Sequence, residues 1–170
     1  MKKLLLLKVR RALLGVAAAS LLTTTVSARA DDDGSVVHWK SVIGIIQAGN
    51  LVGNIAGGGQ PWSTTGGEAG VNLRSGELGF RVRGLVLAGG NTIGTPGAIN
   101  QVKGTLICDA GATNVTVDTP LVPLSATGDA SFSGNLSIPA TCSPSNIAFL
   151  VRIAAGRWIA NGAVRESKDD

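Results

Sequence analysis

The sequence predicts an all-β protein with a single antiparallel β-sandwich domain of seven to nine short strands. The second choice is a partly open β-barrel. Three observations carry this prediction. The chain holds 24 Gly in 170 residues, its apolar residues recur in short runs between Gly, Pro, Asn and Ser, and two stretches pair with themselves as hairpins. After residue 30, no stretch has apolar residues at helical spacing over three turns.

Residues 1–30 have the pattern of a cleaved secretory signal peptide. Five Lys and Arg lie within residues 1–11, residues 12–26 are apolar or small, and Ala28-Arg29-Ala30 matches an A-x-A cleavage site. The apolar run is too short to cross about 30 Å of hydrocarbon, so cleavage is favoured over a membrane anchor. Arg10-Arg11 partly resembles a twin-arginine signal, but Val9 stands where Ser or Thr is usual, which favours the general secretory route. We therefore expect export to the periplasm or the cell exterior.

Residues 31–170 remain after cleavage, and their charge differs from that of the whole chain. The signal peptide removes six of the 15 Lys and Arg and none of the 11 Asp and Glu, which leaves nine against eleven, or −2. The basic character of the whole chain therefore does not predict a nucleic-acid partner. A length of 140 residues suits one domain. We expect an acidic, frayed start at residues 31–34 and a charged tail at 165–170.

Residues 68–83 form the clearest predicted hairpin. With Ser75-Gly76 as a two-residue turn, apolar residues face apolar residues and charges face opposite charges. The predicted pairs are Arg74–Glu77, Leu73–Leu78, Val71–Phe80, Ala69–Val82 and Glu68–Arg83. Beyond this hairpin, either Gly84 is a bulge that shifts the alternation, or the strand becomes buried on both faces.

Residues 147–164 form the second predicted hairpin, with Ala155-Gly156 as its turn. Its pairs are Ile153–Trp158, Val151–Ala160, Phe149–Gly162 and Ile147–Val164, and Phe149 would cover the cross-strand glycine. Other strands are expected at 36–47, with a bulge or close approach at Gly44, and at 101–108. Weaker strands are expected at 114–124, an edge because of Pro120 and Pro123, and at 130–138.

Cys108 and Cys142 are the only cysteines, and export would place them in an oxidising compartment. Cys108 shares the inward alternation of its strand, and Cys142 lies in a loop that can reach it. We therefore predict a Cys108–Cys142 disulfide. The alternative is a nucleophilic cysteine with His38 as its base.

The sequence offers no catalytic signature, metal site or cofactor motif. His38 is the only histidine, so metal sites that need two imidazoles are excluded. The Gly-rich loops lack the spacing of a P-loop or dinucleotide fingerprint. Carboxylates available for glycoside hydrolysis are Glu68, Glu77, Asp109, Asp118 and Asp129, of which the predicted hairpin gives Glu68 and Glu77 arginine partners.

Two turn-rich loops, 48–62 and 88–100, are the predicted contact regions. Trp62 could stack on a sugar ring if exposed, although a packed loop anchor is favoured. The candidate ligand-binding residues are Trp62, Gln60, Asn91 and Thr92. Arginines on a shared sheet face could bind an acidic polymer, but scattered surface positions are favoured; these are Arg81, Arg83, Arg152, Arg157 and Arg165. Sequons at Asn114 and Asn135 matter only in a host that glycosylates.

The sequence therefore favours an exported, non-catalytic module that binds or builds structure at the envelope or outside the cell. Expected partners are a carbohydrate or an envelope or extracellular protein. One alternative is a hydrolase of envelope or extracellular polymers. Another is a self-associating structural protein, because an edge strand without proline can pair with a neighbouring molecule.

Overall fold

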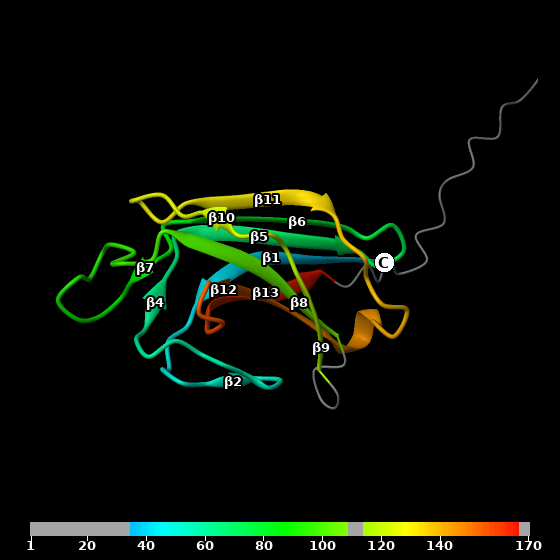
Figure 1. Cartoon of the computed structure of the whole chain (residues 1–170), viewed down its shortest axis with the longest axis horizontal. Helices are drawn as coiled ribbons and strands as arrows, with labels where there is room; N and C mark the ends of the chain where they lie inside the picture. The colour runs from blue at the N-terminus through cyan, green and yellow to red at the C-terminus, as the bar shows by residue number, and fades with distance from the viewer. Residues whose placement is uncertain (1–34, 109–113, 167–170) are drawn as a thin grey trace, which may run out of the picture. The chain divides into compact units, whose positions relative to one another are not determined.

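The computed structural model describes residues 35–108 and 114–166, and Figure 1 shows their arrangement. This part of the chain is all-β, with one large antiparallel sheet curled into a half-barrel and two small ladders. It contains no helix long and apolar enough to span a bilayer. The predicted signal peptide lies outside the described residues, as does Asp109.

Nine strands build the large sheet, in the order β10-β8-β12-β13-β1-β5-β6-β11 with β9 beside β8. They are β1 (Val36–Gly44), β5 (Gly66–Asn72), β6 (Glu77–Arg83), β8 (Gln101–Cys108), β9 (Val115–Asp118), β10 (Val122–Pro123), β11 (Ala130–Asn135), β12 (Ile147–Ile153) and β13 (Trp158–Glu166). The small ladders pair β2 (Leu51–Val52) with β3 (Ile55–Ala56) and β4 (Trp62–Ser63) with β7 (Val86–Leu87).

The antiparallel all-β prediction is confirmed, and the arrangement is closest to the partly open barrel. One curled sheet takes the place of two separate sheets. The two ends of the sheet approach each other where Pro123 of β10 and Ala130 of β11 line a common hollow. Pro120 lies between β9 and β10, Pro123 lies in β10, and both strands are at the β8 edge of the sheet, as the prolines predicted.

The β5–β6 hairpin exists, but its predicted register is wrong by two residues. The structure pairs Val71 with Leu78 and Glu68 with Arg81. The turn is longer than predicted because the Asn72 carboxamide accepts hydrogen bonds from the backbone N–H groups of Arg74 and Ser75, both at 3.0 Å. Such an Asx turn closes a wider loop. A shift of two residues keeps every side chain on its predicted face.

The β12–β13 hairpin keeps its predicted Val151–Ala160 pair, but a bulge next to Val151 makes Trp158 face Arg152 instead of Ile153. The predicted cover of Gly162 by Phe149 is also wrong. Gly162 pairs with Val42 of β1, and a Cβ at Gly162 would lie 2.7 Å from the Trp39 ring. The first and last strands of the sheet-forming chain are therefore neighbours.

Glycines lie at the end of β1 and directly after β6, and the prediction is confirmed for the first of them only. A Cβ on Gly44 would lie 2.1 Å from the Trp62 carbonyl oxygen, which is the predicted close approach. Gly84 has a φ of 60°, and the chain leaves the large sheet there. Both predictions for Gly84 assumed that the strand continues past it, and this is wrong: β6 ends at Arg83, and Val86 and Leu87 form a separate short strand that pairs with β4.

Four aromatic rings fill the interior of the half-barrel. Phe149 of β12 lies 5.7 Å from Trp39 and 5.6 Å from Phe80 between ring centroids, and Phe80 lies 6.4 Å from Phe132 of β11. Gly104 on β8 makes room for them, since a Cβ there would lie 2.9 Å from the Phe80 ring. The rings thus link strands that are distant in the sheet.

The predicted disulfide is present. Cys108 is fully buried at the end of β8, and its bond to Cys142 attaches the loop that follows β11 to the sheet. Both cysteines are oxidised in this bond, so neither has a free thiol that could act as a nucleophile in the disulfide-bonded protein.

Gly104→Ala should lower the free energy of unfolding by about 1–3 kcal/mol, because the added methyl group overpacks the aromatic cluster. Urea unfolding measures this change. Gly79→Ala is the matched control on β6, since the nearest atom to its Cβ would be 3.6 Å away. Equal effects of the two substitutions would contradict the packing role of Gly104.

Replacing Cys108 and Cys142 together by Ala should lower the free energy of unfolding by about 3–4 kcal/mol, because the bond closes a loop with a sequence separation of 34 residues. Denaturant unfolding of the native protein, with and without reductant, gives the comparison. Reductant should not change the free energy of unfolding of the double variant. A change would contradict the assignment of the Cys108–Cys142 disulfide.

Candidate functional site

The two predicted contact loops meet at one end of the half-barrel, but Trp62 does not reach the surface. The Ala88 N–H donates to the Pro61 carbonyl at 2.9 Å, and Trp62 pairs with Leu87. Trp62 is only 6% exposed and its own N–H bonds the Ile45 carbonyl at 2.7 Å. It is a packed loop anchor, the favoured of the two sequence interpretations, and it is not accessible for stacking on a sugar.

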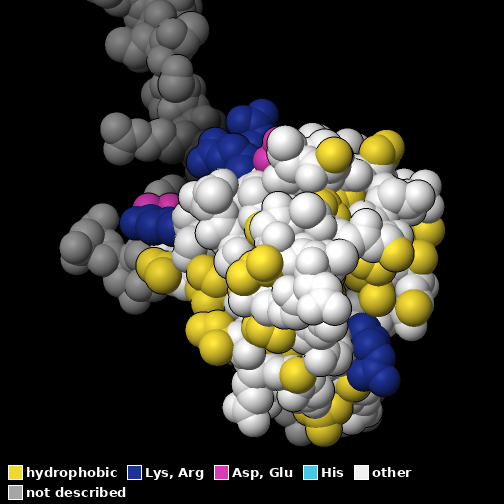
Figure 2. Space-filling model, turned by 90° about the vertical axis from the view of Figure 1, so that its left-hand side faces the viewer, with side chains coloured by type: hydrophobic (Ala, Val, Ile, Leu, Met, Phe, Trp, Pro, Cys, Tyr) yellow, Lys and Arg dark blue, Asp and Glu magenta, His cyan; other side chains and the backbone are white. Residues whose placement is uncertain are grey.

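The other candidate residues of these loops, Gln60, Asn91 and Thr92, are exposed. The Gln60 side chain lies beside Gly90, so the two loops are neighbours. Figure 2 shows this end of the domain as a surface of hydrophobic and uncharged side chains, with charged groups of both signs at its margins. Residues 45–67 and 84–102 indeed contain no charged residue. Ile46, Leu51 and Ile93 are each more than 60% exposed.

The five arginines do not gather on one face. Arg152 donates from Nε to the Gly156 carbonyl at 2.8 Å, Arg157 donates to the Gly57 carbonyl at 3.0 Å, and Arg165 donates to the Pro144 carbonyl. Arg81 and Arg83 lie on the outer face of β6. The scattered arrangement favoured by the sequence is confirmed for these positions.

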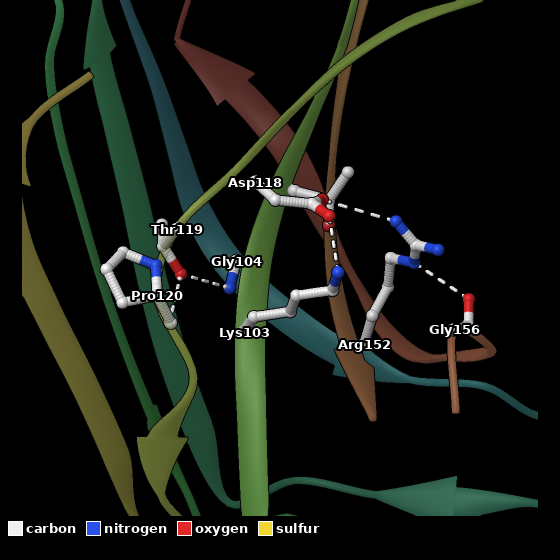
Figure 3. Close-up of polar contacts among 8 residues, drawn as sticks. Lys103, Gly104, Asp118, Thr119, Pro120, Arg152 and Gly156 are labelled. Atoms are coloured by element: carbon white, nitrogen blue, oxygen red, sulfur yellow. Dashed lines mark hydrogen bonds and ion pairs between the residues drawn. The ribbon is translucent and has the colours of Figure 1, made fainter. Parts of the chain in front are cut away.

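Asp118 is the centre of a polar cluster on β8, β9 and β12 (Figure 3). Its Oδ1 accepts from the buried Thr105 hydroxyl at 2.6 Å and from Arg152 at 3.2 Å, and its Oδ2 pairs with Lys103. Burial by itself raises the pKa of Asp118, but the hydrogen bonds from Lys103 and Thr105 and the two positive charges outweigh it and hold the pKa below its ordinary value. Asp118 is thus an ionised acceptor whose oxygens are occupied.

The neighbouring residue Thr119 continues this attachment of β9 to β8. Its hydroxyl accepts a hydrogen bond from the Gly104 N–H at 2.9 Å and donates to the Pro120 carbonyl at 2.9 Å (Figure 3). Because every polar group here has a protein partner, the cluster holds strands together and is poorly suited to exchange protons with a substrate.

Asp129 is occupied in a similar way. Its Oδ1 accepts from the Gly84 N–H at 3.0 Å and its Oδ2 accepts from the Thr127 hydroxyl at 2.9 Å. The hydrogen bond from Gly84, followed by that from Thr127, holds the pKa of Asp129 below its ordinary value. Asp129 therefore fixes the chain where it leaves β6.

Glu68 and Glu77 share the outer face of the β5–β6 hairpin but are too far apart for glycoside hydrolysis. Glu68 lies opposite Arg81, which is four residues from Glu77 along β6. At about 3.4 Å per residue, the two carboxylates stand roughly 14 Å apart along the strands. Catalytic pairs in glycosidases span roughly 5–9.5 Å.

These two glutamates line a groove on the outer face of β1, β5, β6 and β11. The groove holds about 660 Å³. Its floor is the directly opposed pair Gly70–Gly79, with His38 on one side and Ser133 on the other in the same cross-strand row. The His38 ring lies over Gly70, 3.2 Å from where a Cβ would be. The polar residues along the groove are His38, Glu68, Asn72, Glu77, Arg81, Ser131 and Ser133.

Three charged groups in this groove have no partner in the described part of the chain. The side chains of Glu68, Glu77 and Arg81 make no hydrogen bond shorter than 3.5 Å and no ion pair there, in contrast to Asp118 and Asp129. Their hydrogen-bonding capacity is directed to the solvent within the groove and is available to a ligand.

The sequence analysis missed this groove because its register paired Glu68 with Arg83 and Glu77 with Arg74. The signal that could have found it is the alternation itself. Outward positions read Glu68-x-Gly70-x-Asn72 on β5 and Glu77-x-Gly79-x-Arg81 on β6. A glycine between two polar residues on each strand leaves a depression flanked by polar groups.

Comparison with protein-family models, with curated proteins and with solved structures finds no match for this chain. No group of three or more potential metal ligands occurs within residues 35–108 and 114–166. The groove is therefore interpreted from its own geometry and chemistry.

Asp118→Asn should lower the free energy of unfolding at pH 7 by about 1–2 kcal/mol, a figure kept small because the carboxylate is 35% exposed. Its lowered pKa stabilises the native chain above the ordinary value of 3.8, and this stabilisation is lost as the pH falls through the native pKa. Acid unfolding of the variant should therefore depend less on pH below about 4. Glu68→Gln is the control, and an equal effect of both would contradict the role of the cluster.

Proposed function

We propose that the protein is an exported, non-catalytic module that binds a carbohydrate chain in the outer groove across β1, β5, β6 and β11. One observation carries the proposal. Charged and polar side chains with unused hydrogen-bonding capacity surround a glycine floor, over which a ligand can approach the backbone closely. The bonded carboxylates elsewhere on the protein offer no such capacity.

The mixture of groups favours a polyhydroxylated ligand. Sugar hydroxyls both donate and accept. The groove supplies acceptors in Glu68 and Glu77, donors in Arg81 and in the carboxamide nitrogen of Asn72, and a group of both kinds in the Ser133 hydroxyl. The two carboxylates outnumber the single guanidinium, which disfavours nucleic acid and other polyanions. The imidazole of His38 adds a ring face at the edge of the floor.

Export is part of the proposal, and the disulfide supports it. A buried Cys108–Cys142 bond persists in an oxidising compartment, and the pattern of residues 1–30 is that of a secretory signal. Envelope and extracellular polysaccharides are the carbohydrates that such a protein would meet. The periplasm and the cell exterior both fit these features.

Hydrolysis is the weaker alternative because its carboxylates are either occupied or far apart. Asp118 and Asp129 accept hydrogen bonds from protein donors, and Glu68 and Glu77 stand about 14 Å apart, as derived above. Glu166 lies opposite His38, but its carboxylate forms an ion pair with Lys40 at 2.8 Å, and no hydrogen bond joins it to His38 among the described residues, as a catalytic triad would need. Non-catalytic binding needs no such pairing.

Gly79→Gln should abolish carbohydrate binding without unfolding the protein. A Cβ at Gly79 would make only ordinary van der Waals contacts, the nearest at 3.6 Å, and the rest of the side chain would fill the groove above its floor. Glycan-array binding and pull-down with envelope polysaccharides provide the readout, and circular dichroism verifies the fold. Arg81→Ala should weaken binding at least tenfold through loss of charge-assisted hydrogen bonds.

The double variant Gln60→Ala/Thr92→Ala is the matched control in the loops. It should bind as the unsubstituted protein does. Binding that survives Gly79→Gln but is lost in the loop variant would move the site from the groove to the loops. Absence of binding to any glycan by the unsubstituted protein would reject the proposal.

A further inference from the structure

The end of the outer groove at which β6 leaves the large sheet differs in charge from the rest of the groove. A second hollow of about 260 Å³ lies there and shares Glu68 and Arg81 with the groove. Two further cations, Lys40 and Arg83, line this hollow. Three cationic side chains and one carboxylate therefore surround the hollow, whereas two carboxylates and one guanidinium surround the groove.

Arg81 and Arg83 extend from the same face of β6, because residues two apart in a strand point to the same side. Both side chains are exposed, and the buried Val82 between them points inward. Their Cα atoms are roughly 7 Å apart at the usual rise of a strand. Two long side chains at this spacing can reach one small anion between them, so the two guanidinium groups can act on the same ligand group.

Gly66 lines the hollow and makes room for Arg83, which faces it across the β5–β6 ladder. The Arg83 guanidinium extends over Gly66, since a Cβ there would lie 3.0 Å from one terminal nitrogen and 3.7 Å from Nε. A side chain at residue 66 would crowd this guanidinium. The glycine thus keeps the surface beneath the cation open to a ligand.

The side chains of Arg81 and Arg83 form no ion pair and no hydrogen bond within residues 35–108 and 114–166. Glu68 stands opposite Arg81 in the ladder, but their charged groups do not pair. The other candidate arginines each donate a hydrogen bond to a backbone carbonyl; these are Arg152, Arg157 and Arg165. The two guanidinium groups at the hollow therefore keep their donors for the solvent or a ligand.

The neighbouring charges do not compete for these donors. Asp129 lines a hollow with Arg83 on the β11 side, but its two oxygens accept hydrogen bonds from a backbone N–H and from a hydroxyl. Lys40 has its own ion pair, with Glu166 at 2.8 Å. Arg81 and Arg83 are therefore the cations at this end of the groove that a ligand can engage.

We propose that the outer groove binds a carbohydrate chain that carries an anionic substituent, and that this substituent binds between Arg81 and Arg83 above Gly66. The inference rests on the proposed carbohydrate binding and adds the chemical class of the ligand. A guanidinium presents its donors in a planar fork that matches the oxygens of a carboxylate or a phosphate. The ligand is thus a glycan with a uronic acid residue or a phosphate group.

Neutral sugars separate the acidic residues of this ligand. Glu68 and Glu77 line the rest of the groove and repel a chain that is charged at every residue. Glu77 and Arg83 lie at opposite ends of β6, about 20 Å apart along the strand. A chain that follows the strands therefore places one anion at the arginine end and neutral hydroxyl groups beside Glu77. A polyuronate does not match this arrangement.

Paired glycans test the anionic substituent. Array glycans with one glucuronate or one phosphate among neutral sugars are each printed beside their carboxyl-reduced or dephosphorylated form. The unsubstituted protein should bind the acidic form at least fivefold more tightly at low salt, and added salt should reduce this preference. The two kinds of pair distinguish a carboxylate ligand from a phosphate ligand. Equal binding of the acidic and neutral forms would overturn the inference.

Arg83→Gln removes one of the two guanidinium groups without changing the lining of the groove. The variant should lose the preference for the acidic form and keep its affinity for the neutral form, and circular dichroism verifies its fold. Arg165→Gln is the matched control, because it removes the same charge from β13 and should keep the preference. A preference that survives Arg83→Gln, or that both variants lose equally, would contradict the assigned site.

A titration without any polysaccharide separates this inference from the carbohydrate proposal. Methyl glucuronoside and glucose phosphate are added to the isotope-labelled protein, and NMR follows the arginine Nε–H signals. The signals of Arg81 and Arg83 should shift with both anionic sugars and not with methyl glucoside, and Arg157 should not respond. If neither signal shifts, the anion site is rejected even where a neutral glycan binds. If both shift while no array glycan binds, the anion site stands and the carbohydrate-chain proposal fails.

Discussion

The close approach of the Phe80 and Phe149 rings to Gly104 is the contact on which the rest of the structure depends. Phe80 comes from β6, Phe149 from β12, and the two strands are four positions apart in the sheet. Their rings can meet only if the sheet curls, and the rings can lie against β8 only because residue 104 has no side chain. Trp39 over Gly162 repeats the arrangement on the neighbouring strands. The half-barrel is thus closed by aromatic packing rather than by hydrogen bonds between its ends.

This packing directs the inward positions to the core and leaves the outward positions free for other uses. On β8, β9 and β12 the outward polar groups bond one another around Asp118 and strengthen the sheet. On β5 and β6 the outward charged groups Glu68, Glu77 and Arg81 flank two opposed glycines and bond nothing in the described chain. The contrast between saturated and unsaturated polar groups separates a structural cluster from a candidate binding site.

The groove lies next to the place where the two ends of the curled sheet approach each other. Ser131 and Ser133 of β11 form one side of the groove, and Ser131 also lines the hollow between Pro123 of β10 and Ala130 of β11. The curl of the sheet that brings these ends together therefore also sets the position of the β11 side of the groove.

The sequence by itself determined the secondary structure, the faces of the strands and the disulfide. Alternation of period two assigns each side chain to a face without reference to other strands, so the faces of β5 and β6 were correct although the register was two residues out. The length of the β5–β6 turn was predicted wrongly because it depends on hydrogen bonds to the Asn72 side chain. Asn72 is visible in the sequence, but the apparent pairing of opposite charges in the shorter turn outweighed it.

Only the tertiary structure decided which strands are neighbours, what covers Gly162, that Trp62 is buried, and that Gly70 and Gly79 lie together under polar side chains. Each of these depends on residues far apart in the chain, and a single sequence does not report the free energy of such contacts. The hairpin at residues 66–83 illustrates both contributions. The alternation in its sequence places Glu68, Glu77 and Arg81 outward. Its register, which only the structure decides, leaves these three side chains without partners in the described chain.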